Sequence, residues 1–183
     1  MELDGQLFRN YNELYALIMC CYKDVSLIDA YGILQKEKRD SYERVPDISN
    51  HFVLLMQKDL ALTLCKIYCD NTKNANTVPR FRNEILRKSS STQKQVEKVK
   101  TKNDIEDKLK NMRNQFLAHA DMNRSSSKIE ISELKEMLDA ICGVFNKVCE
   151  VIDNDRITGI SKEDIDLQNM ICSTELFALY EQN

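Results

Sequence analysis

The chain has 183 residues, of which 43% are hydrophobic and 30% are charged, and its formal net charge is −3. This length suits one domain whose core needs no disulfide or metal to stabilise it. Four glycines and two prolines are too few for the turns of an all-β fold, and no apolar window approaches a membrane span. Residues 1–4 also lack the basic and apolar parts of a signal peptide. We therefore expect an all-α, cytoplasmic protein without a membrane segment.

The first long helix is predicted over residues 3–38, where apolar side chains alternate in steps of four and three. Such a heptad seam is typical of helices that pack in a bundle, and also of helices that bind a partner chain. Bundle core is the ordinary interpretation, and docking of another chain is the alternative. The seam consists of Leu7, Tyr11, Leu14, Ile18, Cys21, Val25 and Ile28.

A second helix is predicted over residues 47–70, beginning at Asp47 or Ser49, and its apolar residues leave almost no polar face. A helix that is apolar all round is normally buried at the centre of a bundle. His51 falls in the first turn of this helix, and we expect it to be exposed and structural.

Three further helices are predicted besides the segment at residues 103–119, and we expect five or six helices in all. One is short and covers residues 77–88. Ser132 is expected to cap another, and Ser161 with Asp164 forms the capping signal of a last helix that ends near residue 180. The stripe of the helix after Ser132 consists of Leu134, Leu138, Ile141, Phe145, Val148 and Ile152.

Residues 103–119 form the segment that carries the candidate chemistry. Asn103 and Glu106 match a capping box, with Asn in the usual Ser or Thr position. At about 100° per residue, Arg113 falls on one shoulder of the following apolar stripe and His119 on the other. The segment therefore predicts a helix that meets another helix beside a polar pocket. Its stripe consists of Ile105, Leu109, Met112 and Phe116.

Arg113, Asn114 and His119 have the chemistry that RNA cleavage requires. A neutral imidazole moves protons near neutral pH, and a guanidinium stays charged and grips phosphate. Asn114 can orient the histidine or bind the substrate. About 120° separates Arg113 from His119 on one helix, so one copy cannot easily direct these groups at the same phosphorus. Two antiparallel copies could do so together. The ordinary alternatives are a histidine that only balances the helix dipole and a solvated arginine.

A basic run leads into this helix. Between residues 80 and 102 eight basic residues stand against two acidic ones, whereas from residue 129 onward twelve acidic residues stand against four basic ones. A run of this kind attracts a phosphate backbone, although a solvated charged face is the ordinary alternative. Residues 93–102 fit either a loop or a helical extension. The residues expected to bind RNA are Arg80, Arg82, Arg87, Lys88, Lys98, Lys100 and Lys102.

The seven cysteines mostly lie inside apolar helical patterns. Cys65 and Cys69 are four residues apart and could bind a metal together. The chain has no CxxC pair, however, and no histidine near them to complete a zinc site. We therefore expect no metal and no cofactor, and we interpret the cysteines as buried, reduced side chains of a cytosolic protein.

The order Arg113-Asn114-x-x-x-Ala118-His119 resembles the R-x(4–6)-H signature of the HEPN superfamily, and it looks most like the U-type group associated with bacterial abortive infection. The likeness in helix order covers about residues 5–155. We expect a single domain, 1–183, whose C-terminal part at about 160–180 is a helical appendage. It implies an up-and-down helical bundle that pairs as a homodimer. In this family two motif helices build one composite cleft.

Many members of the family are metal-independent ribonucleases that leave a cyclic phosphate. The resemblance therefore implies an endoribonuclease of an abortive-infection or toxin–antitoxin system, with an antitoxin or a nucleotidyltransferase as a partner. Some toxin relatives carry a tyrosine two residues after the histidine, which such a partner modifies. This chain has Asp121 there, which puts that control in doubt and makes Asp121 a candidate to support His119 from behind.

Two other functions fit the sequence. One is a non-catalytic HEPN module that binds a nucleotide, RNA or a protein. The other is a helical interaction domain whose heptad seam docks another chain.

Overall fold

The computed structural model describes residues 4–37, 39–43, 46–73, 75–88, 103–118, 130–152 and 156–181, and these residues contain helices and no strand. Six of the helices have eleven residues or more, and a seventh has four. The predicted all-α bundle of five or six helices is thus confirmed, with α2 as one extra turn. In chain order they are α1 (Gly5–Glu37), α2 (Arg39–Tyr42), α3 (Pro46–Cys69), α4 (Val78–Lys88), α6 (Asn103–Ala118), α7 (Ile131–Val151) and α8 (Lys162–Glu181).

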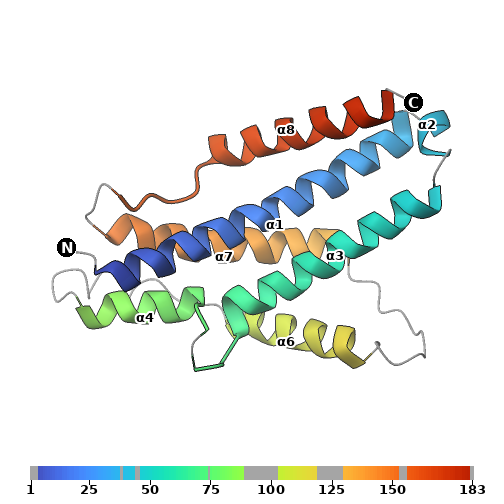
Figure 1. The fold of residues 1–183 in the computed structure, drawn as a ribbon. Coiled ribbons are helices and arrows are strands. Elements are labelled where there is room, and N and C mark those ends of the chain that lie inside the picture. Colours follow the sequence, from blue (N-terminus) through green and yellow to red (C-terminus); the bar gives the residue numbers. More distant parts are fainter. Residues whose placement is uncertain are drawn as a thin grey trace.

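The central helix is α1, which packs against α3, α4, α7 and α8 (Figure 1). Six of its seven seam residues are buried, and Val25 packs against the same core. The ring of Tyr11 stacks on Phe145 of α7 with centroids 5.9 Å apart, and Phe145 lies 6.1 Å from Phe81 of α4. Aromatic pairs of this kind add about 0.5–1.5 kcal/mol beyond the area they bury. The seam is therefore bundle core, and the alternative that it docks another chain is wrong.

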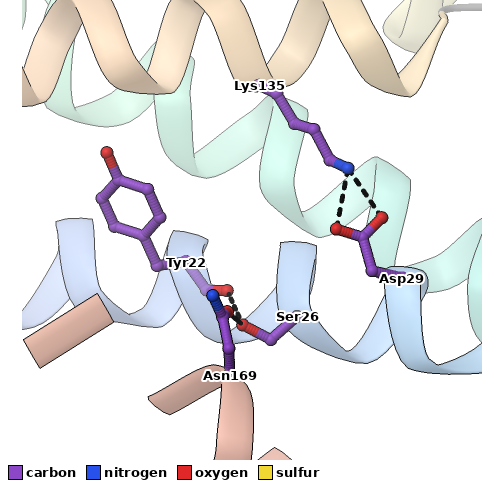
Figure 2. A network of polar contacts seen from close by, with 5 residues as sticks. All are labelled: Tyr22, Ser26, Asp29, Lys135 and Asn169. Atoms are coloured by element: carbon purple, nitrogen blue, oxygen red, sulfur yellow. Dashed lines mark hydrogen bonds and ion pairs between the residues drawn. The ribbon is translucent and has the colours of Figure 1, made fainter. Parts of the chain in front are cut away.

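Polar contacts fix the position of α1 against α7 and α8 (Figure 2). Lys135 Nζ of α7 lies 2.6 and 2.8 Å from the two carboxylate oxygens of Asp29. The buried Ser26 hydroxyl donates to the carbonyl oxygen of Tyr22 at 2.7 Å and contacts the side chain of Asn169 of α8. Because a buried hydroxyl needs its partners, these contacts specify one register of α8 on α1.

The prediction that the second helix is buried all round is wrong for one face of α3. Its inner face is buried at Leu60, Leu64 and Ile67. An outer face stays in solvent along the helix, because α6 covers only the C-terminal part of α3 (Figure 1). We call this face the α3 stripe, and its members are Ile48, Phe52, Leu55 and Leu62, which are 56%, 50%, 45% and 43% exposed.

Two helix starts differ in how well the sequence predicts them. The last helix begins as predicted, because the amide of Asp164 donates to Ser161 Oγ at 3.1 Å and Ser161 N donates back to Asp164 Oδ2 at 3.1 Å. The prediction for Ser132 is wrong, since α7 begins at Ile131 with Glu130 as its N-cap. The carbonyl of Glu130 already accepts the amide of Glu133 at 3.0 Å, which places Ser132 inside the helix.

Six of the seven cysteines are buried and unpaired, as expected, whereas Cys20 is exposed. His51 is exposed as predicted. Within the described ranges, no group of side chains could hold a metal ion. No helix in that part of the chain combines the length and the apolar character that crossing a membrane requires.

Candidate active site

The motif helix α6 lies antiparallel to the C-terminal half of α3, at one side of the bundle (Figure 1). Its predicted stripe faces the core, since Ile105, Leu109 and Met112 are 4%, 0% and 8% exposed. The side chain of Phe116, the fourth stripe residue, lies outside the described part. The stripe thus orients α6 so that its shoulders, where the candidate site residues were predicted, lie at the edge of the core.

Two cysteines of α3 hold α6 in place. Cys65 Sγ donates to the carbonyl oxygen of Leu109 at 3.2 Å, and Cys69 Sγ lies 3.7 Å from the carbonyl of Glu106. Burial raises the pKa of both thiols, that of Cys69 to about 12, so both remain protonated donors at neutral pH. The sequence interpretation missed this contact. The spacing of four residues that suggested a metal pair was the signal, because it also places two small side chains on one face of a helix.

Arg113 lies half-buried beside these thiols. Its charge and its backbone amide offset part of the rise that burial causes in the pKa of Cys65. The Nε atom of Arg113 is buried and has no hydrogen-bond partner among the described residues. Leaving a buried donor without a partner costs about 1–3 kcal/mol. The alternative of a fully solvated arginine is therefore wrong.

The charge of Arg113 also acts on Asp70, at the end of α3. Hydrogen bonds from Thr72, whose backbone N lies 2.9 Å from Asp70 Oδ1, lower the pKa of the carboxyl, and the charges of Arg113 and Arg80 add to that effect. The carboxylate is therefore ionised at neutral pH. It partly balances the positive charge at this end of α3 without bonding to Arg113 Nε.

The other two motif residues are placed differently. Asn114 is exposed next to Arg113 on α6. His119 lies outside the described residues, and so does Asp121. The structure thus gives the position of the arginine and of the asparagine, and it leaves the histidine as a prediction from the sequence.

The predicted RNA-binding residues fall into two groups. Arg80 uses Nη1 to donate to the carbonyl oxygens of Lys73 at 3.0 Å and Ala75 at 2.6 Å, so it fastens the connector before α4. Arg82 donates to its neighbour Asn83 at 3.0 Å, and Arg87 is exposed. The remaining ones lie outside the described side chains: Lys88, Lys98, Lys100 and Lys102.

A cavity of about 440 Å³ lies between α4, the end of α3 and the start of α6. Arg80 and Arg87 line it together with three carboxylates, those of Asp70, Glu84 and Glu106. This mixture of charges does not suit a phosphate. Arg113 does not line this cavity, although its charge acts on Asp70, which does.

Comparison with known proteins gives one family. A family model described as AbiU2, within the HEPN group, matches residues 11–170. The match includes α3, α6 and α7 in full and ends within α8. Neither the curated proteins nor the solved structures include a significant match to this chain.

Proposed function

The chain belongs to the AbiU2 family of HEPN domains, and from this premise we propose that it is a metal-independent endoribonuclease of a bacterial abortive-infection or toxin–antitoxin system. Two copies would share one site. The observation that carries the proposal is the half-buried Arg113, whose Nε has no partner in the described part of the chain. A phosphate is a natural partner for such a group, since guanidinium N–H groups bind phosphate oxygens in pairs.

The proposed reaction uses only groups of the protein and the RNA. His119 of one copy takes the proton of a ribose 2′-hydroxyl, and the 2′-oxygen forms a bond to the adjacent phosphorus. The bond from phosphorus to the 5′-oxygen breaks, and a second histidine supplies the proton to that oxygen. The products are a 2′,3′-cyclic phosphate and a 5′-hydroxyl. Arg113 stabilises the extra negative charge on the phosphorus oxygens, and Asn114 orients the histidine or the substrate.

The α3 stripe supports pairing of two copies. At about 100° per residue, Leu62 of the stripe is only about 60° around α3 from Cys65, which holds α6. A twofold contact through the stripe would therefore bring two α6 helices together. The stripe carries both signs of charge, with Asp59 between Lys58 and Lys66, all exposed. An antiparallel copy can thus place a lysine against Asp59, as a self-complementary contact requires.

The test is cleavage of single-stranded RNA by the purified chain in EDTA, with removal of each motif side chain. His119→Ala should slow cleavage about 10²–10⁴-fold, because it removes the proton carrier. Arg113→Ala should slow it about 10²–10³-fold, because it removes a fixed charge. Arg9→Ala removes an exposed arginine far along the chain from the motif and serves as the matched control, with unchanged cleavage expected.

The basic run gives a second readout. Cleavage should weaken as salt rises, and replacing Lys98, Lys100 and Lys102 by glutamine should reduce that salt dependence. If the wild-type chain binds RNA but cuts none, or if His119→Ala remains as toxic to bacteria as the wild type, a non-catalytic HEPN binding module is the correct function instead.

A further inference from the structure

Helix α8 is apolar on two opposite faces. The inner face packs on α1, with Cys172 and Leu176 only 1% and 5% exposed. The outer face carries a second set of apolar residues in solvent, which we call the α8 stripe. At about 100° per residue this stripe is about 100° wide and lies opposite the inner face. Its members are Leu167, Met170, Ile171 and Ala178, and the first three are 53%, 61% and 40% exposed.

The α8 stripe is a fixed helical surface and not a frayed end. Ser161 and Asp164 cap the start of α8. Near its middle, Asn169 contacts the buried Ser26 of α1 (Figure 2). Near its end, Tyr180 shares a hydrogen bond of 2.7 Å with Ser49 of α3. Helix α8 lies along the C-terminal part of α1 as an outer layer (Figure 1), so a partner would meet a surface that needs no ordering.

Acidic side chains border the α8 stripe on both sides. Around the helix, Asp166 falls on one edge and Glu175 on the other, and Glu163 lies one turn before Leu167. All three are exposed, and they form no ion pair within the described residues. The one basic residue of α8 is Lys162, at its first position. The surface is therefore an apolar strip between unbalanced carboxylates.

This charge distribution selects among the chemical classes that could cover the stripe. A second copy would bring its own carboxylates against these, and like charges in contact are destabilising. RNA and anionic lipid surfaces would be repelled for the same reason. A helix with apolar residues on one face and Lys or Arg on both shoulders would bury the stripe and pair every carboxylate.

We propose that the α8 stripe docks a basic amphipathic helix of another polypeptide. The contact lies on α8, outside the residues proposed for RNA cleavage. The carboxylates speed the encounter and set the orientation, and Leu167, Met170 and Ile171 supply the buried area. Because this proposal makes no use of Arg113 or His119, either proposal can fail without the other.

The experiment measures binding of two labelled synthetic helical peptides of about five turns each, with leucine on one face and either lysine or glutamate on both shoulders. Fluorescence anisotropy should show that the full chain binds the lysine peptide at least tenfold more tightly than the glutamate peptide. The double variant Met170→Ser, Ile171→Ser should lose at least tenfold in affinity for the lysine peptide. Leu54→Ser, at an exposed apolar residue of α3 outside the α3 stripe, is the matched control and should leave binding unchanged.

Charge reversal separates a site on α8 from general attraction between a basic peptide and an acidic chain. The double variant Asp166→Lys, Glu175→Lys should reverse the preference, so that the glutamate peptide binds more tightly. Equal binding by the wild type and the serine variant would overturn the proposal. So would self-association that Met170→Ser abolishes, or uptake of the wild-type chain by vesicles of anionic lipid, because the stripe would then serve a second copy or a membrane.

Discussion

Helices α3 and α8 each carry an exposed apolar stripe, and the two stripes differ in the charges beside them. Phe52 and Leu167 are exposed to nearly the same extent, 50% and 53%. Lys58, Asp59 and Lys66 accompany the α3 stripe, whereas carboxylates alone accompany the α8 stripe apart from Lys162 at the first position of the helix. The exposed fractions of the apolar side chains are thus similar in the two places, and charge is the property that separates them.

The difference shows how charge selects the kind of partner. A stripe with both signs of charge can face a rotated copy of itself, because each charge finds its opposite across the twofold axis. A stripe with one sign cannot, and it needs a partner of opposite charge. We therefore assign the α3 stripe to contact between copies and the α8 stripe to a different chain. A charge placed in either stripe tests this assignment.

The largest effect is expected from a charge placed in the α3 stripe. Leu55→Glu puts two carboxylates into a twofold contact, one from each copy, so the dimer should dissociate and RNA cleavage should fall about 10²–10³-fold as the shared site is lost. Sedimentation and a cleavage assay on the same sample measure both quantities. The matched change on the other helix, Met170→Glu, should leave both unchanged, and loss of the dimer in that variant would reverse the assignment.

A smaller effect is expected at Arg113, where a substitution should make the folded chain more stable. Arg113→Met removes the buried Nε donor that has no partner, so the free energy of unfolding without RNA should rise by about 1 kcal/mol. Cleavage should be lost in the same variant, because the guanidinium of Arg113 is proposed to stabilise the complex with RNA and not the free protein. A urea denaturation curve checks the first part. A fall in stability would mean that Arg113 is a structural residue.

Much of the fold follows from the period of apolar residues. The seam of α1 is buried as predicted, and Ile105, Leu109 and Met112 of α6 are buried too, because each set repeats at the spacing of a helix face, and burial of such a face is what stabilises a bundle. The Ser161 cap was predictable because it is a local contact between side chain and backbone. The family is also predictable from the sequence, since the motif and the helix order indicate the same family that matches residues 11–170.

What the sequence could not predict depends on neighbours. Apolar residues occur on almost every side of α3, and the positions of α1, α6 and α7 decide which of them are covered. The same holds for Cys65, whose contact with Leu109 requires knowing that α6 lies on that face. The arrangement of His119 around Arg113 belongs to this class as well, because in our proposal it depends on a second copy.

The smallest effect is expected at a carboxyl pair between α1 and α3. Burial, with the charge of Asp59 beside it, raises the pKa of Asp24 to about 6. Asp24 binds its proton more tightly in the folded chain than in the unfolded one. Below about pH 4 the carboxyl is protonated in both states, so it does not lower the free energy of unfolding. Its cost grows as pH rises and is complete above about pH 6.

Asp24→Asn should therefore stabilise the chain at pH 7 and change little at pH 4. Because Asp24 is only partly buried and solvent screens its charge, we expect a gain of about 1 kcal/mol. Asp59→Asn should give part of the same gain in the monomer, because it removes the neighbouring charge. In the dimer, however, it should also remove the partner that a lysine of the second copy would meet. Urea denaturation at both pH values, at concentrations below and above dimer formation, distinguishes these cases. If Asp59→Asn stabilises the chain equally at both concentrations, the charges of the α3 stripe do not take part in self-association.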